Sequence, residues 1–364
     1  MDMADLGPSG LGKGVMDFSL LYFANRQSNN APREYELLFE SVGFADRHGF
    51  KAVWLPERHF HPFGGAYPNP ALAAAALATR TSNVRLRAGS VVIPLHDPLS
   101  VVEDWSVVDN LSGGRVDIAL AAGWNPDDFA LAPERYAKRR EFTFDALKEV
   151  KSLWAGETVR RRNGNGQETD VAAYPRAVQP ELDLWFTCSS SRESFTEAGA
   201  RGLNVLTALL FQSTDELTAS IESYRAARER NGHDPGTGIV TLMLHTFVGE
   251  NDAAVRELVR EPFTDYLVSS IDLWKARWTD LAGTHPRRLA DLAFERYFHR
   301  AALLGSVERC TAVAREIQTA GVNEIACLID FGAADSAVLA MLPLLDEVRR
   351  DLRVDGSSPL QHGG

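Results

Sequence analysis

Short apolar runs alternate with helix-like segments along most of this 364-residue chain. Eight of the runs have the length and composition of buried parallel strands: residues 16–22, 52–55, 84–93, 116–121, 184–187, 204–209, 239–248 and 323–328. No linker separates the repeats, so the sequence predicts an α/β fold, with one (β/α)8 (TIM) barrel over residues 15–352. An open doubly wound sheet is the alternative, but the first strand lacks the G-x-G-x-x-G turn typical of dinucleotide-binding sheets.

Two insertions are expected within the barrel. Residues 159–174 have the pattern of a surface hairpin before the fifth strand. The connection between the seventh and eighth strands, about 251–323, is too long for one helix. Its aromatic residues are expected to pack over the barrel mouth: Trp274, Trp278, Tyr297 and Phe298. Residues 1–14 are expected to form a disordered leader, and residues 353–364 a flexible tail.

Charge and composition exclude several classes of function. The chain has 38 Lys and Arg against 49 Asp and Glu, a formal charge of −11, and its longest basic run is Arg160-Arg161-Arg162. This balance argues against nucleic acid or an anionic membrane as a partner. The most apolar stretch, 70–78, is too short to span a bilayer. Three widely spaced cysteines (Cys188, Cys310 and Cys327) are typical of a reduced, cytoplasmic protein.

A dense group of titratable residues follows the second strand. Glu57, Arg58, His59 and His61 all lie between Pro56 and Pro62. Barrel enzymes carry their chemistry at the carboxyl ends of strands, and a partly buried Glu–His pair suits general acid/base catalysis. A polar loop whose histidines are satisfied locally is the structural alternative.

The His59-x-His61 pair also resembles the first ligand pair of barrel metallohydrolases. Such a site requires further ligands at later strand ends, where Thr187-Cys188 and Thr207 are poor substitutes and only His245 and Asp330 qualify. We therefore expect no metal.

Hydroxyl side chains surround the helix start after the fifth strand: Ser189, Ser190, Ser191 and Ser194. One hydroxyl serves as an ordinary helix cap, but four exceed that need. The free N–H groups of a helix start bind phosphate, with Arg139 or Arg140 as the cationic partner. Small residues at Gly89-Ser90 and at 121–123 either allow close packing or leave room for a flat ring. Together these features predict an enzyme with a phosphorylated cofactor.

Several segments carry a family resemblance: Gly49–Trp54, Glu57-Arg58-His59-Phe60, Asn69-Pro70, Ile93–Pro98, Glu103-Asp104-Trp105, Leu111–Val116, Ala200-Arg201-Gly202 and Gly305–Glu308. With these, the chain resembles the luciferase-like monooxygenases, the flavin-dependent barrels that include bacterial luciferase and alkanesulfonate monooxygenase. It is most similar to the branch of that family found in natural-product gene clusters.

The resemblance implies a set of cofactor contacts. Glu57 and Ser90 would contact the flavin ring, with Gly89-Ser90 as a strained peptide that is cis in relatives, and Cys188 would lie near the ring. The FMN phosphate would be held by Arg140, Ser190, Ser191 and Ser194. The family's luciferases have two adjacent histidines after the Glu, whereas here Arg58 replaces the first and only His59 remains. Light emission is therefore not expected. An arginine that luciferase carries after the fourth strand is Ala122 here.

We therefore expect a two-component monooxygenase that receives reduced FMN (FMNH2) from a separate NAD(P)H:flavin reductase. It would use O2 to hydroxylate a natural-product intermediate, or to insert oxygen beside a carbonyl, with the substrate free or tethered to a carrier protein. His59, Glu57 and Arg58 are the expected catalytic residues. His59 and Glu57 would serve proton transfer and flavin positioning, and Arg58 would contact the substrate or the peroxide. A deazaflavin-dependent oxidoreductase and a non-catalytic flavin-binding partner subunit are the alternatives.

A homodimer is also expected. Relatives pair through their second and third helices, and here the second helix, about 70–79, is rich in alanine. Small side chains allow close approach of helices, although the same alanines would also pack well against the barrel alone.

Overall fold

Eight parallel strands close into a barrel in the computed structural model, which describes residues 15–23, 35–210, 212–274 and 286–354. They are β1 (Asp17–Leu21), β2 (Ala52–Leu55), β3 (Arg85–Val92), β4 (Val116–Ala121), β7 (Leu184–Thr187), β8 (Asn204–Ala208), β9 (Val240–Val248) and β11 (Glu324–Leu328). Each strand pairs with the next in that order, and β11 pairs with β1 to close the ring. All eight predicted strands are confirmed, and the open-sheet alternative is wrong.

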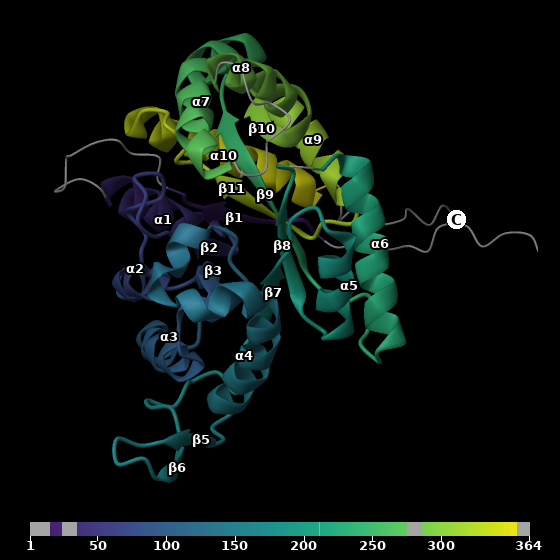
Figure 1. Cartoon of the computed structure of the whole chain (residues 1–364). Helices are drawn as coiled ribbons and strands as arrows, with labels where there is room; N and C mark the ends of the chain where they lie inside the picture. Colours follow the sequence, from purple (N-terminus) through teal and green to yellow (C-terminus); the bar gives the residue numbers. More distant parts are fainter. Residues whose placement is uncertain (1–14, 24–34, 211, 275–285, 355–364) are drawn as a thin grey trace, which may run out of the picture.

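The helices lie outside the strands (Figure 1). They are α1 (Glu36–His48), α2 (Pro70–Ala78), α3 (Pro98–Ser112), α4 (Arg139–Trp154), α5 (Arg192–Ala200), α6 (Thr214–Arg230), α7 (Asp252–Trp274), α8 (Pro286–Arg296), α9 (Val307–Thr319) and α10 (Asp335–Val354). Local signals set several of their ends. Gly49 ends α1 with φ of 75°, and Ser213 opens α6 through a capping box with Glu216.

Both predicted insertions are present. The first is an antiparallel hairpin of β5 (Val159–Arg162) and β6 (Glu168–Val171), which projects beyond α4 at the bottom of Figure 1. The second contains α7, α8, a π-helical turn (Tyr297–Ala301), α9 and a strand that the sequence analysis missed, β10 (Ala302–Gly305). This strand pairs with the second half of β9, beyond the residues that pair with β8.

The prediction that aromatic residues of the second insertion pack over the barrel mouth can be checked for only some of them. Tyr297 and Phe298 are buried, and Tyr266 of α7 packs against Phe63 of the loop after β2, with ring centroids 5.0 Å apart. The insertion therefore reaches the loops at the barrel mouth. Trp278 and the side chain of Trp274 lie outside the described residues, as do the predicted leader and nearly all of the tail.

Charged side chains are paired inside the barrel. Arg87 of β3 donates to Asp117 of β4 over 2.7 Å and to both carboxylate oxygens of Glu324 of β11 over 2.7 and 2.9 Å. Its guanidinium contacts the rings of both Trp54 and Trp185, 4.8 and 4.5 Å from their centroids. Several strands are thus tied together through one fully buried cation, whose charge is compensated by hydrogen-bonded carboxylates.

The described helices include none that combines the length and the apolar character needed to cross a bilayer.

Candidate active site

A cavity of about 320 Å³ opens at the carboxyl ends of the strands. Its walls come from β1, β2, β3, β4, β7, β8 and β9 and from the residues just beyond them. Of the predicted site residues, eight line it: Glu57, Arg58, Gly89, Ser90, Arg140, Cys188, Ser190 and Ser194. The topology of the barrel therefore brings together side chains that are up to 137 positions apart (194 − 57) in the sequence.

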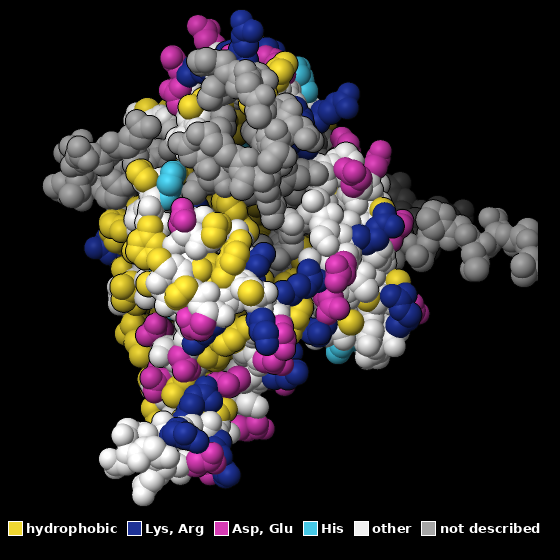
Figure 2. All heavy atoms as spheres, viewed as in Figure 1, with side chains coloured by type: hydrophobic (Ala, Val, Ile, Leu, Met, Phe, Trp, Pro, Cys, Tyr) yellow, Lys and Arg dark blue, Asp and Glu magenta, His cyan; other side chains and the backbone are white. Residues whose placement is uncertain are grey.

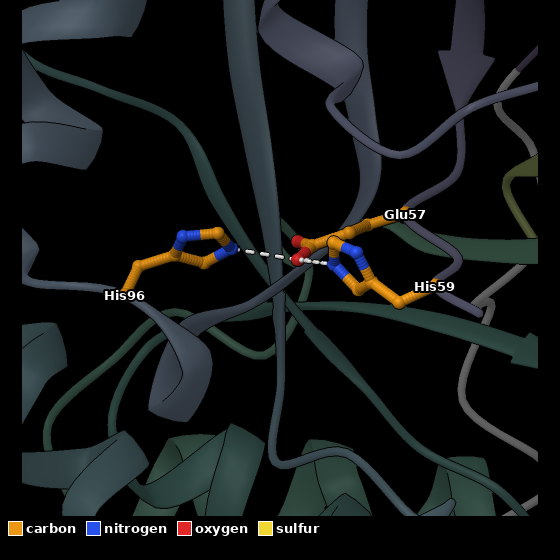
Figure 3. Close-up of side chains that lie close together, drawn as sticks. All are labelled: Glu57, His59 and His96. Atoms are coloured by element: carbon orange, nitrogen blue, oxygen red, sulfur yellow. Dashed lines mark hydrogen bonds and ion pairs between the residues drawn. The ribbon is translucent and has the colours of Figure 1, made fainter. Parts of the chain in front are cut away.

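The Glu57 carboxylate is the centre of a hydrogen-bond network. Its Oε1 atom lies 2.7 Å from Nε2 of His59 and 2.6 Å from Nε2 of His96, and its Oε2 atom accepts the backbone N–H of Val92 over 2.8 Å. Figure 3 shows the two imidazoles approaching the carboxylate from opposite sides. His96 comes from the turn after β3, so the network joins two neighbouring strand ends.

The network sets the protonation of its members. Burial raises the pKa of the Glu57 carboxyl, but the hydrogen bonds from His59, His96 and Val92 outweigh burial and hold that pKa below its usual range. For His96, burial lowers the pKa, but the hydrogen bond and charge of Glu57 outweigh it and raise the pKa above its usual value. An anionic Glu57 with a protonated His96 is thus the favoured pair in mildly acidic solution. A buried group of this kind can hold a proton at the cavity wall.

Arg58 directly follows Glu57 in the sequence and is also buried. Its Nη1 atom is 3.8 Å from Oδ2 of Asp128, and its guanidinium carbon is 5.3 Å from the centroid of the Trp124 ring. The Oδ1 atom of Asp128 accepts a 2.8 Å hydrogen bond from Asn125. Burial raises the pKa of the Asp128 carboxyl, and the charge of Arg58 only partly offsets this.

The wall between β3 and β4 is built from small residues. The Gly89–Ser90 peptide bond is cis, and the Ser90 hydroxyl is hydrogen-bonded to that of Thr187. A Cβ at Gly89 would meet the Trp54 side chain at 3.1 Å, so a larger residue there would require this ring to shift. Gly123 has φ of 74°, and a Cβ there would lie 2.8 Å from Val92. Small residues thus keep the wall flat and open.

Hydroxyls and a cation meet at the start of α5. Nη1 of Arg140 lies 3.5 Å from Oγ of Ser194, and Nη2 of Arg140 lies 3.5 Å from a carboxylate oxygen of Glu193. Ser190 is exposed at the cavity, and Ser191 is the N-cap residue, although its hydroxyl makes no capping bond to the described backbone. Arg139 instead donates to the carbonyls of Gly123 and Tyr136, which identifies Arg140 as the arginine of this site.

Two predicted site residues stand apart from the cavity wall. His59 reaches it through Glu57, and neither His59 nor Ser191 is among the described lining residues. Cys188 lines the cavity, but burial raises the pKa of its thiol well above the usual value, so it is not a nucleophile.

The His59-x-His61 metal hypothesis finds no support in the geometry. His61 accepts the backbone N–H of Phe63, and His245 is enclosed by four aromatic rings with its pKa lowered by burial to about 3. Glu57, His59 and His96 do place three ligand atoms within 4.8 Å of one another. Those atoms are already hydrogen-bonded together, and the absence of a metal stays a prediction.

The sequence analysis missed His96, Asp128 and Thr187 as parts of the site. His96 lies in the Ile93–Pro98 segment that carries part of the family resemblance, and a titratable residue after the third strand was a usable signal. Asp128 sits seven residues beyond β4, in a 3₁₀ turn (Pro126–Leu131), where no strand-end rule points to it.

A cavity at the carboxyl ends of the strands is where (β/α)8-barrel enzymes carry their active sites. The luciferase-like monooxygenase model matches residues 16–324, so the chain belongs to that family and is a flavin-dependent monooxygenase. It is 29% identical over 259 residues to the oxygenase component of the flavin-dependent trigonelline monooxygenase of Acinetobacter baylyi, covering 69% of this chain and 71% of that one.

Solved structures share the fold. The oxygenating constituent of 3,6-diketocamphane monooxygenase from Pseudomonas putida, in complex with FMN, superposes with a TM-score of 0.76 at 18% identity. The match covers 93% of this chain and 98% of that one. An F420-dependent secondary alcohol dehydrogenase superposes with a TM-score of 0.67 at 16% identity, covering 92% and 98%. At these identities the likeness shows the fold alone.

Proposed function

We propose that this protein is the oxygenase of a two-component system, which uses FMNH2 from a separate NAD(P)H:flavin reductase. The observation that carries the proposal is the meeting of Arg140 with the hydroxyl-rich start of α5 at a cavity that is also lined by small residues of β3 and β4. A phosphate suits the first feature and a flavin ring the second. A relative described as an oxygenase component supports the two-component arrangement.

The residues present fit FMN. Arg140, Ser190, Ser191 and Ser194 would hold its phosphate by charge-assisted hydrogen bonds. The Gly89–Ser90 segment would lie against the ring, with Glu57 beside it. When bound, the reduced flavin supplies the activation of oxygen, and the protein supplies position and the exclusion of water.

Proton handling falls to the Glu57 network. His96 holds a proton against the Glu57 carboxylate, and His59 shares the same oxygen atom while remaining partly exposed. A proton can therefore pass between the cavity wall and solvent along two imidazoles joined by one carboxylate. Arg58 is assigned to contact with the substrate.

The proposed substrate is a natural-product intermediate, either free or tethered to a carrier protein. The apolar lining of the cavity supports an organic substrate of this kind, and hydroxylation and insertion of oxygen beside a carbonyl are the two proposed outcomes.

A deazaflavin enzyme is the second candidate, because a protein that uses F420 shares the fold. The two cofactors differ beyond the phosphate, so direct titration separates them. A partner subunit without activity would bind FMN but would form no product.

The test is a titration of the purified protein with FMN and F420, followed by admission of oxygen to the protein with reduced FMN. We expect quenching of FMN fluorescence and a transient absorbance distinct from both free redox states of FMN. Preferential binding of F420 would instead identify the deazaflavin enzyme. FMN binding without any transient would identify the partner subunit.

We also propose a homodimer formed through α2 and α3. Leu72, Val107 and Leu111 are 71%, 44% and 50% exposed, and Figure 2 shows apolar side chains gathered over these helices. The alternative, that the alanines of α2 only pack inward, holds for Ala71, Ala74 and Ala78, which are buried. It does not explain the exposed leucines and valine of these two neighbouring helices.

A further inference from the structure

The guanidinium of Arg58 is a buried cation with an unfilled edge. Arg58 lines the cavity but is only 6% exposed, and its Nε and Nη2 atoms have no hydrogen-bond partner among the described residues. Its Nη1 atom faces Oδ2 of Asp128 at 3.8 Å, which is beyond hydrogen-bond reach. Leaving two N–H groups of a buried cation unpaired is costly, and native proteins rarely do so without a reason.

The unfilled edge is the one that binds carboxylates. The N–H bonds of Nε and Nη2 run parallel along one side of a guanidinium and match the two oxygens of a planar anion. The same chain uses this edge elsewhere, because Nε and Nη2 of Arg85 donate to the two oxygens of Asp117, each over 2.6 Å. At Arg58 the described part of the chain presents the donor pair without the acceptor pair.

The neighbouring acids do not fill the edge. Both oxygens of Glu57 accept from His59, His96 and the Val92 backbone. The Oδ1 atom of Asp128 accepts from Asn125, and burial raises the pKa of this carboxyl, so it is a weak counter-ion for Arg58. A molecule bound in the cavity can supply the acceptor pair that these acids do not.

We propose that the substrate of this enzyme carries a carboxylate, which Arg58 binds side-on through Nε and Nη2. The inference rests on the proposed function and gives its substrate a chemical class. Both N–H groups are now screened from water, so binding includes a turn of the guanidinium toward the cavity. Such a turn breaks no hydrogen bond of Nε or Nη2 among the described residues, since the contacts of the guanidinium there are the 3.8 Å ion pair and the Trp124 ring.

Trp124 indicates what the carboxylate is attached to. This ring also lines the cavity, as do the apolar side chains of Phe23, Phe63 and Met243. A flat apolar body bearing a carboxylate can therefore contact the aromatic wall while its charge meets Arg58. Arg140 lies in the first turn of α4 and faces Ser194 of α5, so this separate cation is left for the phosphate of the cofactor.

The experiment compares benzoate with its uncharged analogue benzamide. Isothermal titration calorimetry measures both affinities for the FMN-loaded full chain and for the R58M, R58K, R140M and R162M variants. Arg162 is exposed on the β5–β6 hairpin and is the matched control for loss of a positive charge. FMN affinity is measured in parallel by flavin fluorescence, so a failure of the proposed function is seen separately.

We expect the unaltered protein to bind benzoate at least about tenfold more tightly than benzamide, as hydrogen bonds to a charged group imply. R58M should abolish the preference, and R58K should restore part of it, because an ammonium lacks the parallel N–H pair. R162M should keep it.

Equal affinities in the unaltered protein, including no binding of either probe at millimolar concentration, would overturn the proposal. So would loss of the preference in R140M with its retention in R58M, which would place the anion at the phosphate site. Circular dichroism checks that each variant is folded, and R58K serves if R58M is not.

Discussion

Replacing Glu57 with Gln removes the charge from a buried carboxylate that accepts three hydrogen bonds. The amide can keep its carbonyl toward the Val92 N–H and can donate to neutral forms of His59 and His96, so the shape of the network survives. Hydrogen bonds to a charged group are worth about 1.5–3 kcal/mol and roughly twice their neutral counterparts. Each of the two imidazole bonds therefore loses about half of its strength, and the two together remove about 1.5–3 kcal/mol of stability.

The loss should depend on pH in a defined way. The pKa of Glu57 is lowered in the folded state, so its stabilisation is present above its ordinary value of 4.5 and disappears as pH falls through the folded value. The pKa of His96 is raised, so its stabilisation is complete below its ordinary value of 6.5 and disappears as pH rises through the folded value. Both contributions are complete together between pH 4.5 and 6.5. The difference between the unaltered protein and E57Q should be largest in that window.

Urea unfolding of the apoprotein at a series of pH values from about 4 to 9, which brackets both ordinary pKa values, measures this difference. A matched control is E134Q, which removes a charge from an exposed carboxylate in the turn after β4 and should change stability little at any pH. A difference between the unaltered protein and E57Q that stays flat across this range would refute the assigned Glu57–His96 charge pair. A difference that grows steadily toward the alkaline end would do the same.

Three further predictions follow from the site and the surface. S194A combined with R140M should weaken FMN binding at least about tenfold by fluorescence titration. The control T196A removes a hydroxyl that donates to the Arg192 carbonyl, away from the described cavity lining, and should leave FMN affinity unchanged. Unchanged FMN affinity in the double variant would show that the phosphate does not bind at Arg140 and Ser194. His59→Ala should strongly lower the rate of product formation but change the melting temperature little, because His59 is partly exposed and loses a single hydrogen bond. A loss of activity that only follows a loss of folded protein would favour a purely structural role. Leu72→Glu should shift a dimer toward monomer in sedimentation at low micromolar concentration, and a monomeric unaltered protein would contradict the proposed interface.

The barrel could be predicted because the same local sequence signals recur in each strand–helix repeat. Each strand contributes a short apolar run, and many helices contribute a cap or a glycine stop, as at Gly49 and Ser213, so errors at one repeat do not change the fold. The strand β10 was missed because it lacks such a repeated local signal. Its four residues carry no alternation and follow a helical segment, and only their pairing with β9 makes them a strand.

The candidate site was predictable only where residues are close in sequence or lie at a strand end. Glu57, Arg58 and His59 are adjacent, and the serines around α5 form one run, so both groups stand out. The partner that sets the charge of Glu57, His96, lies 39 positions away, and its role depends on the registry of β2 beside β3. Such pairings are produced by folding and have no local pattern.

Arg58 shows how the two kinds of information combine. The sequence marks it as a departure from the paired histidines of luciferases, which by itself says only that the chemistry at that position differs. The structure adds that the arginine is buried, lines the cavity and lacks acceptors for one edge among the described residues. Both oxygens of Glu57 accept hydrogen bonds from other groups, and the nearer oxygen of Asp128 stays 3.8 Å from Nη1 of Arg58. A histidine at this position would offer at most two donors on opposite sides of a ring, whereas the guanidinium offers two on one side. The substitution therefore exchanges a group suited to proton transfer for one suited to binding a planar anion. We propose that proton transfer falls to His59, His96 and the carboxylate between them.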